Sequence, residues 1–385
     1  MAPIRIALIG LSSHAKTGWA ANAHLPYLLS PAGRSKYIIV ALCNSSVSSA
    51  QRAIEAYHLP SSTKAYGDPV ALAEDEDVDL VVCSTRVDTH YELTKPSAER
   101  GKHVFTEWPL THDVGKSEEL GDLVREKGGK SMVGCQGRLA PVVLKMKELV
   151  ESGNWGKVLS CEVRAFGGTA DRETAAEGLA YFADRKIGGN VYMIGFAHLW
   201  DTVQAVLGEA TELKSQLQLQ RPIMKLRDAS GNIVGTIPVD VPDLIIVDGS
   251  LNSSPTAHNG ASLSVRYRRG QPFKDEPGLT WHINCERGEI RLTSPSGPSL
   301  QANSYDAPVA IDVHDFATDQ VHSETWEWQK WQDDLNLPVM GRSVASLYEA
   351  FYDHIVDGKE RTYPDFEDAV IRHRQLDSLL DGWEA

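Results

Sequence analysis

The chain has 385 residues, which is enough for two domains of ordinary size, at about 150 residues each. Its formal net charge of −14 argues against direct binding to nucleic acid, because such binding needs a cationic face. No apolar run approaches the roughly 20 residues of a membrane-spanning helix, and no signal-peptide pattern precedes the first strand, so we expect a cytoplasmic protein with no membrane partner.

The cysteines stand mostly in apolar runs such as VVCS and ALCN. They form no C-x-x-C pair and have no metal-ligand spacing to histidine. We therefore predict small buried side chains in a reduced compartment, and no metal site. The residues are Cys43, Cys83, Cys135, Cys161 and Cys285.

Residues 1–139 alternate short apolar runs with helical stretches. We expect strands at 4–10, 37–44, 78–85, 103–108 and 131–137, and helices near 18–30, 47–57, 68–74, 90–101 and 113–127. Runs that are apolar on both faces suit parallel strands covered by helices. The pattern predicts a dinucleotide-binding, Rossmann-type α/β domain with a doubly wound parallel sheet, which binds ligands beyond the carboxyl ends of its strands.

The segment IALIGLSSHAKTGWAANAH (6–24) follows the first strand and leads into a helix. Backbone N–H groups and the helix dipole at such a turn can receive a pyrophosphate. The loop departs from G-x-G-x-x-G because Ser12 replaces the second glycine and the next glycine is Gly18, so an ordinary strand-to-helix turn is the alternative. The predicted cofactor contacts are Gly10, Ser12, Ser13, Gly18 and Trp19.

The second expected strand ends without an acidic residue, at the place where this fold normally holds the ribose diol of NAD. The sequence there is CNSSVSSAQR (43–52), and Asn44, Ser45 and Ser46 could hydrogen-bond a 2′-phosphate instead. We therefore predict NADP as the cofactor, with NAD as the alternative. The same hydroxyl groups could simply cap a helix that begins near Val47.

After residue 139 the segments become longer and alternate with a period of two, which is typical of antiparallel strands with one solvated face. We expect a helix at 140–153, strands at 157–167, 212–221, 243–251, 261–270, 280–286 and 288–294, and helices at 343–358 and 365–382. The pattern of residues 140–385 thus predicts an α+β domain with an open, mostly antiparallel sheet. We expect this domain to contact the substrate and to form the oligomer. Its last helix could pack on the first domain.

Five segments in order resemble the Gfo/Idh/MocA oxidoreductase family along almost the whole chain. STRVDTHYEL (84–93) is similar to the family's T-P-N-x-x-H loop, and AERGKHVFTEWPL (98–110) is similar to its G-K-H-V-x-x-E-K-P run. The other segments are 134–158, 188–201 and 363–380. The resemblance implies cofactor contacts from Ser84, Thr85, Arg86, His90, Glu107 and Trp108, with Arg86 in place of the family's proline.

The GWA…H loop, the glutamate-tryptophan pair at 107–108 and the QGR sequence at 136–138 resemble the subfamily of the fungal galactose repressors more closely. Those proteins sense a dinucleotide and bind a transcription activator. The resemblance therefore implies, as one alternative, a catalytically silent regulator with a protein partner and a nuclear location. The chain keeps little of that subfamily's long insertions, so the role does not follow automatically.

Trp108 stands where the family carries the lysine of E-K-P beside the reacting carbon. An indole N–H can donate a hydrogen bond but cannot exchange a proton near neutral pH, so Trp108 cannot be the acid or base. Two explanations stay open. The flat ring could pack on the nicotinamide or on an apolar, aromatic substrate, or it could plug a site that no longer turns over.

The segment GGNVYMIGFAHLWD (188–201) takes the place of the family's catalytic helix, but Met193 or Ile194 occupies the usual aspartate position. His198 remains, and Asp201 follows one helical turn later on the same face. A histidine oriented by a carboxylate is a reasonable acid or base, and a hydrogen-bonded interface histidine is the alternative. We predict His198, Tyr192 and Asp201 as the catalytic residues.

Three further residues are predicted to contact substrate, namely Gln136, Arg138 and Tyr181. Gln136 and Arg138 follow the fifth strand, and Arg138 could hold an anionic or carbonyl group. The leading hypothesis is an NADP-linked oxidoreductase that acts on a small carbonyl or alcohol, with an apolar or aromatic substrate as one option. The alternatives are the regulator and a non-redox enzyme on the same scaffold. The resemblance also implies a homo-oligomer formed through the C-terminal sheet.

Overall fold

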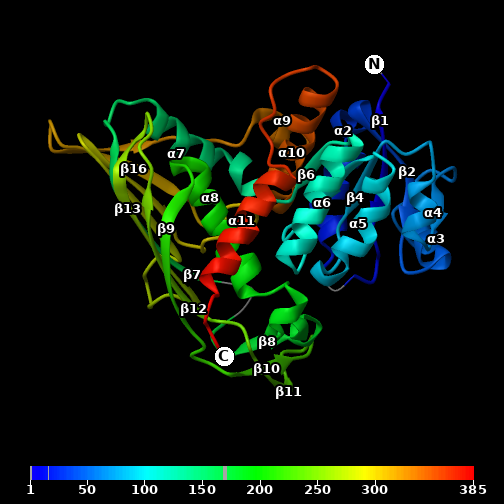
Figure 1. Cartoon of the computed structure of the whole chain (residues 1–385), viewed down its shortest axis with the longest axis horizontal. Coiled ribbons are helices and arrows are strands. Elements are labelled where there is room, and N and C mark those ends of the chain that lie inside the picture. The colour runs from blue at the N-terminus through cyan, green and yellow to red at the C-terminus, as the bar shows by residue number, and fades with distance from the viewer. Residues whose placement is uncertain (1, 16, 168–170) are drawn as a thin grey trace. The chain divides into compact units, whose positions relative to one another are not determined.

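The computed structural model describes residues 2–15, 17–167 and 171–385, so residue 16 of the predicted glycine loop lies outside the described residues (Figure 1). The chain divides into two units. Unit 1 comprises residues 1–136, 186–189 and 330–374, and unit 2 comprises 137–185, 190–329 and 375–385. The chain thus first leaves unit 1 close to the predicted boundary at 139, and a C-terminal segment returns to unit 1.

Unit 1 contains a six-stranded sheet in the order β3-β2-β1-β4-β5-β6. Each neighbouring pair is parallel, and the strand order reverses at β1, where doubly wound sheets bind their ligands. This confirms the predicted Rossmann-type sheet. The strands are β1 (Ile4–Ile9), β2 (Tyr37–Cys43), β3 (Lys64–Tyr66), β4 (Leu80–Cys83), β5 (His103–Thr106) and β6 (Ser131–Val133).

The helix expected near 18–30 is broken into pieces. A π-helix comes first, α1 follows, and α2 begins at Pro31 with the Ser30 hydroxyl accepting from the Gly33 N–H at 3.0 Å. Pro26 lies in the first turn of α1 and Pro31 at the start of α2, and neither can donate a helical hydrogen bond. The short strand β3 was also missed, because three residues are too few for a periodic pattern.

The remaining segments of unit 1 follow the predicted α/β alternation, and residues 330–374 add α9, α10 and most of α11. The helical elements are η1 (Ala20–His24), α1 (Leu25–Leu29), α2 (Pro31–Lys36), α3 (Val47–Ala56), α4 (Pro69–Ala73), η2 (Val87–Thr89), α5 (His90–Glu99), α6 (Val114–Lys127), α9 (Lys330–Asp334), α10 (Val339–Ile355) and α11 (Phe366–Leu379). Two short helices, η3 (Gln136–Leu139) and η5 (Arg185–Ile187), lie where the chain crosses between the units.

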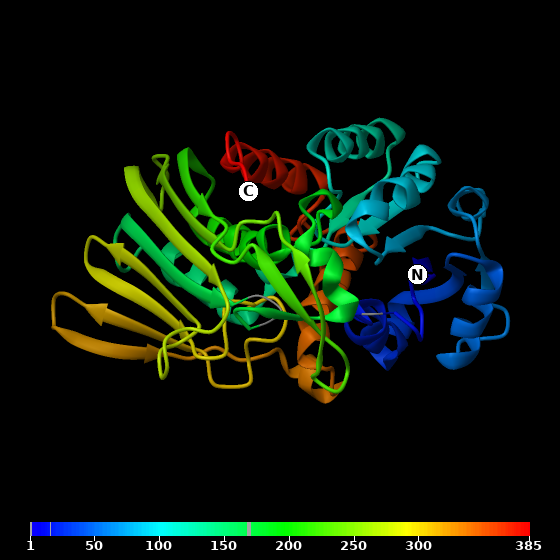
Figure 2. The ribbon, with the colours of Figure 1, turned by 90° about the horizontal axis from the view of Figure 1, so that it is seen from below.

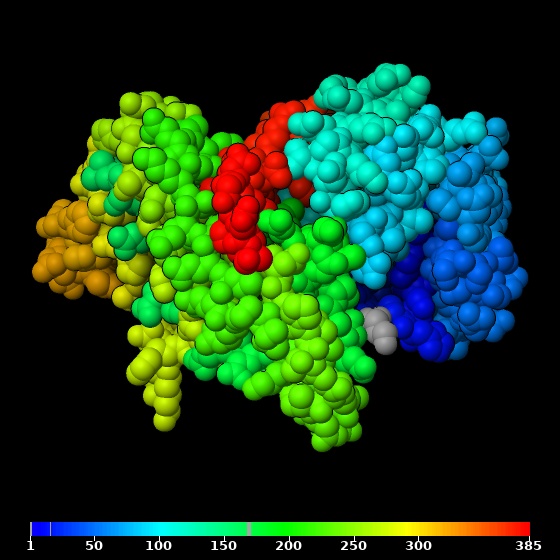
Figure 3. All heavy atoms as spheres, turned by 60° about the horizontal axis from the view of Figure 1, so that its bottom comes forward, coloured from blue at the N-terminus to red at the C-terminus, as the bar shows by residue number. Residues whose placement is uncertain are grey.

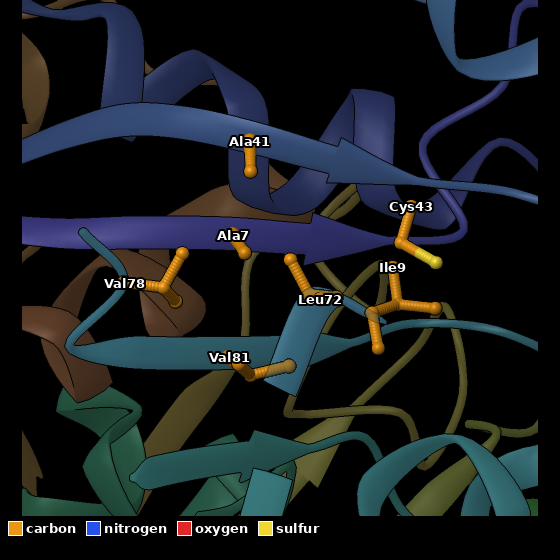
Figure 4. Close-up of a cluster of buried hydrophobic side chains, with 7 residues drawn as sticks. All are labelled: Ala7, Ile9, Ala41, Cys43, Leu72, Val78 and Val81. Carbon is orange, nitrogen blue, oxygen red and sulfur yellow. The ribbon is translucent and has the colours of Figure 1, made fainter. Parts of the chain in front are cut away.

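A cluster of small and branched apolar side chains packs against the sheet of unit 1 (Figure 4). Ala7 of β1 lies opposite Ala41 of β2, and these small side chains leave room for Leu72 of α4. Burying a side chain of the size of leucine or valine contributes about 1.5–3 kcal/mol. The cluster therefore anchors the strands whose carboxyl ends carry the predicted cofactor loops.

Unit 2 contains an eight-stranded sheet in the order β17-β16-β15-β14-β7-β13-β12-β9 (Figure 2). Only β7 and β13 pair in parallel within this sheet, so the predicted, mostly antiparallel architecture is confirmed. The strands are β7 (Val158–Gly167), β9 (Ala210–Gln218), β12 (Leu244–Leu251), β13 (Ala257–Arg269), β14 (Leu279–Cys285), β15 (Gly288–Ser294), β16 (Ala310–Asp315) and β17 (Gln320–Glu324).

A second, three-stranded sheet in unit 2 was not predicted. It has the order β11-β10-β8, and its hairpin stands out in yellow-green at the bottom of Figure 3. Ile233 and Val234 are adjacent on β11 and both about half exposed, so this strand lacks the alternating pattern that would reveal it. The strands are β8 (Thr174–Ala176), β10 (Ile223–Arg227) and β11 (Ile233–Pro238).

The helical elements of unit 2 lead from the first crossing into the predicted catalytic segment. They are α7 (Pro141–Glu151), η4 (Glu177–Ala183), η6 (Val191–Phe196) and α8 (Ala197–Leu207). All five cysteine side chains are buried, as predicted. Among the described residues, no helix combines the length and apolar character that crossing a membrane would require.

Candidate functional site

Gly10 places the glycine loop directly against the end of β4. Its φ is +97°, and a Cβ atom there would lie 2.3 Å from the Ser84 carbonyl oxygen and 2.6 Å from the Thr85 methyl carbon. Only glycine fits this position, both because of the left-handed backbone and because of the close approach. The loop therefore comes close to two predicted cofactor-binding residues at the switch point of the sheet.

The second half of the loop ends in the π-helix η1. Gly18 has φ +61°, and its carbonyl oxygen accepts from the Asn22 N–H at 2.9 Å. The Trp19 Nε1 atom is buried and has no hydrogen-bond partner among the described residues. A buried, unsatisfied donor beside a glycine loop is consistent with a site that a ligand completes. In the first half of the loop, the Ser12 hydroxyl accepts from the His14 N–H at 3.2 Å. The Ser13 hydroxyl lies 3.1 Å from Nδ1 of the same histidine.

Two of the three polar residues after β2 have structural roles. The Asn44 side-chain amide donates to the Leu11 carbonyl at 2.9 Å and thereby braces the glycine loop. The Ser46 hydroxyl accepts from the Ser49 N–H at 3.2 Å and caps α3, as the capping alternative expects. Ser45 is exposed. Contact with a 2′-phosphate stays a prediction, and Ser45 is now its best-placed hydroxyl.

The loop after β4 is held by its own side chains. The Thr85 and Thr89 hydroxyl groups lie 2.8 Å apart. Arg86, which replaces the family's proline, donates from Nε and one terminal nitrogen to the two carboxylate oxygens of Asp88, both at 2.6 Å. This bidentate pair, with the Arg86 carbonyl accepting from the Thr89 hydroxyl at 2.6 Å, stiffens a turn that a proline would otherwise restrain.

His90 is a structural link in this structure. It is 1% exposed, and its ring nitrogens lie 2.9 Å from the Pro109 carbonyl oxygen and 3.1 Å from the Thr85 carbonyl oxygen. Burial lowers the pKa of His90, and the neutral ring can donate to only one of the two carbonyl groups. The predicted cofactor residue therefore joins the loop after β4 to the turn at Trp108.

A buried network surrounds Glu107. Its Oε1 atom lies 2.7 Å from His24 Nε2, and His24 Nδ1 lies 2.8 Å from the Tyr348 hydroxyl. The Trp108 N–H donates to Glu107 Oε2 at 3.3 Å. Gly134 makes room for the carboxylate, because a Cβ atom there would lie 2.2 Å from Oε2. The GWA…H resemblance had marked His24, whereas no sequence pattern pointed to Tyr348.

The Trp108 indole is packed inside unit 1, and Trp108 is only 4% exposed. Its ring centroid lies 4.8 Å from that of His373 on α11, with the planes inclined by 39°. His373 is 2% exposed, and burial lowers its pKa to about 3. This packing fits the explanation in which the ring plugs a site that no longer turns over, and stacking on a nicotinamide stays a prediction.

In unit 2, Asp201 is held by Arg138. The Arg138 Nε and a terminal nitrogen donate to the two oxygens of Asp201 at 3.0 and 2.7 Å. The side chains are 18% and 2% exposed, so this is a buried, bidentate ion pair. His198 lies one turn earlier on α8 and is 8% exposed. The sequence had assigned the two charged residues separate roles, and those roles stay predictions beside this pairing.

Tyr192 does not fit its predicted catalytic role. Its hydroxyl donates to the Leu376 carbonyl at 2.7 Å, the residue is 1% exposed, and burial raises its pKa well above the ordinary range. It lies in the π-helix η6, whose start is capped by Asn190. Tyr181 is half-buried on η4 with its ring 4.9 Å from Phe182.

Gln136 is the last residue of unit 1 before the chain first enters unit 2, and it is 1% exposed. Its Oε1 atom has no hydrogen-bond partner among the described residues. An unsatisfied, buried acceptor is unusual and is consistent with the predicted ligand contact. No group of three His, Cys, Asp or Glu residues within the described ranges is placed to hold a metal ion.

Two families match successive parts of the chain. Residues 4–135 match the family described as "Oxidoreductase family, NAD-binding Rossmann fold". Residues 141–294 match "Gal80p, C-terminal domain". Unit 1 thus carries an NAD(P)-binding type of sheet, and the matched part of unit 2 is of the type found in Gal80p.

Individual relatives extend this similarity over the whole chain. The dehydrogenase aclE of Aspergillus oryzae is 31% identical over 383 residues, which cover 99% of this chain and 96% of that protein. The regulatory protein GAL80 of Saccharomyces cerevisiae is 26% identical over 305 residues, covering 77% of this chain and 68% of that protein.

Solved structures share the fold. A super-repressor mutant of Gal80p from Saccharomyces cerevisiae has a TM-score of 0.84 at 23% identity, over 98% of this chain and 95% of that chain. Levoglucosan dehydrogenase in complex with NADH has a TM-score of 0.75 at 19% identity, over 99% and 96% of the two chains. Because a relative with 31% identity spans almost the whole chain and the N-terminal domain matches the family itself, this chain belongs to the Gfo/Idh/MocA family of oxidoreductases.

Proposed function

We propose that the chain is an NADP-dependent oxidoreductase that acts on a small carbonyl or alcohol. The observation that carries the proposal is the glycine loop of unit 1, in which Gly10 brings the backbone within van der Waals contact of Ser84 beyond the switch point of a parallel sheet. The full-length similarity to a protein named as a dehydrogenase supports it. The buried Trp19 Nε1 and Gln136 Oε1 atoms, unsatisfied among the described residues, support a ligand nearby.

The proposed cofactor is NADP, with NAD as the alternative. No carboxylate stands directly after β2 in the sequence, and Ser45 is exposed there. A serine hydroxyl can hydrogen-bond a 2′-phosphate, whereas a carboxylate would repel it. Because Asn44 and Ser46 are engaged in bracing and capping, we expect the preference for NADP over NAD to be modest.

The bound nicotinamide would supply or accept the hydride. The proton that accompanies the hydride needs a protein group, and an indole at position 108 cannot provide it. We assign this role to His198, because an imidazole can exchange a proton near neutral pH. Asp201 lies one turn further along α8, where its ion pair with Arg138 holds the carboxylate in place. An apolar or aromatic substrate would suit the ring of Trp108.

The test begins with cofactor binding. Titration calorimetry with NADPH and NADH should show saturable binding with a preference for NADPH, and absence of binding would end the proposal. Turnover is then followed by nicotinamide absorbance against a panel of aliphatic and aromatic aldehydes, ketones and alcohols. The His198→Ala variant should lose turnover but keep its NADPH affinity. The matched control, His314→Ala, removes a partly exposed histidine of β16 and should change neither.

A catalytically silent regulator is the second candidate. Two observations favour it, namely the match of residues 141–294 to the Gal80p domain and the packing of the Trp108 ring against His373. This candidate predicts NADPH binding without turnover of any compound in the panel. The Trp108→Lys variant separates the two further, because it should impair an enzyme built around the indole but should leave a silent site silent.

We also propose that the chain forms a homo-oligomer through the outer face of the eight-stranded sheet. This face is polar and partly solvated, as the alternation of buried and half-buried residues along β14 shows. Light scattering coupled to size-exclusion chromatography measures the molar mass directly. A monomeric mass across the accessible concentration range would contradict this part of the proposal.

A further inference from the structure

A buried carboxylate lies at the carboxyl ends of two neighbouring strands of the unit 1 sheet. Glu107 follows β5 directly, and its N–H donates to the carbonyl of Cys83, the last residue of β4, at 3.0 Å. A dinucleotide that binds across such a sheet places its adenosine half beside β2 and its pyrophosphate at the glycine loop after β1. We therefore expect its nicotinamide half on the other side of the switch point, over β4 and β5, where Glu107 stands.

The residues around Glu107 favour the charged form of its carboxylate. The Tyr348 hydroxyl can donate to His24 Nδ1 at 2.8 Å, which leaves the Nε2–H of His24 to donate to Glu107 Oε1 at 2.7 Å. The Trp108 N–H donates to Oε2 at 3.3 Å. Hydrogen bonds donated to a carboxylate favour its ionised form, and both of these form with a neutral His24 ring. Glu107 is only 7% exposed, so salt and solvent screen its charge weakly.

The two aromatic rings next to this carboxylate bring no positive charge with them. The Trp108 indole has no group that ionises near neutral pH, and it packs on the His373 ring with 4.8 Å between the centroids. Burial lowers the pKa of His373 to about 3, so its imidazole is neutral near pH 7. Of the side chains named around the end of β5, Glu107 is thus the one that supplies a charge, and the charge is negative.

We propose that Glu107 makes the site bind oxidised NADP more tightly than NADPH, and so favours reduction of a carbonyl over oxidation of an alcohol; this rests on the proposed function. The nicotinamide ring is positive in oxidised NADP and neutral in NADPH, so a nearby carboxylate attracts only the oxidised form. Stabilising the product of hydride donation makes bound NADPH a stronger hydride donor. The carbonyl carbon gains the hydride, and the carbonyl oxygen gains the proton already assigned to His198.

Titration calorimetry on the full chain, with oxidised NADP and with NADPH in separate runs, measures the preference without any turnover. The wild-type protein should bind the oxidised form about tenfold more tightly, as expected for one pair of opposite charges a few ångströms apart in a protein. Glu107→Gln keeps an oxygen that accepts from His24 but removes the charge, so the two affinities should become nearly equal. Glu107→Asp keeps the charge and should keep most of the preference, although its shorter side chain should weaken both affinities.

The control is Asp79→Asn, which removes a carboxylate from the opposite end of the same sheet. Asp79 precedes β4 and is paired with Arg5 at 2.7 Å, so the ratio of the two affinities should stay at its wild-type value. Equal affinities in the wild type, or tighter binding of NADPH, would overturn this inference and leave the proposed function standing. An unchanged ratio in Glu107→Gln, or an equal change in Asp79→Asn, would overturn it as well. If neither form binds, the proposed function falls and this inference falls with it.

Discussion

Acidification should destabilise this protein measurably through His373. Burial lowers the pKa of His373 to about 3, whereas an ordinary histidine has a pKa near 6.5. The folded chain therefore keeps the ring neutral at a pH where the unfolded chain already binds a proton. The free energy of unfolding is fully retained above about pH 6.5 and is lost progressively as the pH falls toward about 3.

The size of the effect follows from the same two pKa values. A pH of 5 lies about 1.5 units below the ordinary pKa, so the ring is protonated in the unfolded chain and stays neutral in the folded one. This difference corresponds to about 2 kcal/mol of lost stability. The loss approaches about 5 kcal/mol near pH 3. Asp113 acts against the shift through its negative charge, but burial among neighbours such as Trp108 is the larger influence.

Urea unfolding at pH 8 and pH 5, followed by tryptophan fluorescence, measures the loss. His373→Phe keeps an aromatic ring against Trp108 but cannot bind a proton, so it should lose about 2 kcal/mol less than wild type between the two pH values. Burial also lowers the pKa of His90 and His103, and their contributions cancel in this comparison. The control His58→Asn changes an exposed histidine at φ 52°, a backbone that asparagine tolerates. Equal acid losses in wild type and His373→Phe would refute the reasoning.

Three further variants probe the glycine loop and two buried hydrogen-bonded pairs. Gly10→Ala should destabilise unit 1 by roughly 1–3 kcal/mol or more and abolish NADPH binding, whereas Gly128→Ala, with positive φ but open space around it, should cost about 1 kcal/mol and leave binding intact. His24→Leu leaves its glutamate partner buried without this hydrogen bond and should cost about 3–5 kcal/mol in urea unfolding; a loss below about 1 kcal/mol would contradict the buried network. Arg138→Met should cost a similar amount, about 3–5 kcal/mol, and adding Asp201→Leu should recover part of it, which additive losses would disprove.

Local patterns were sufficient for the α/β alternation of unit 1. Apolar runs such as IRIALI and LVVC are buried on both faces, and that is the signature of a parallel strand under two layers of helix. The helix expected at 18–30 failed as a single element because Pro26 cannot donate a helical hydrogen bond and because Ser30, which precedes Pro31, has an extended backbone. The hairpin of β10 and β11 was missed because adjacent residues of β11 are exposed alike.

The candidate site was predicted in part. The glycine loop and the loop after β4 lie together as expected, because Gly10 approaches Ser84 directly. The capping role of Ser46 was foreseen as an alternative, whereas the structural use of His90 and Tyr192 was not. A side chain's direction depends on what packs around it, and spacing along the chain does not contain that information.

The sequence by itself determined the class of sheet in each part of the chain and the order of the family's motifs, because both depend on residues that are close together in the chain. Tertiary structure alone decided the partners of the buried polar and charged side chains. His24 meets a hydroxyl 324 positions away, and Arg138 meets a carboxylate 63 positions away. Such pairs form because a buried charge or polar group without a partner is costly. Local periodicity does not distinguish among the many possible partners in the chain, so only the fold decides which ones meet.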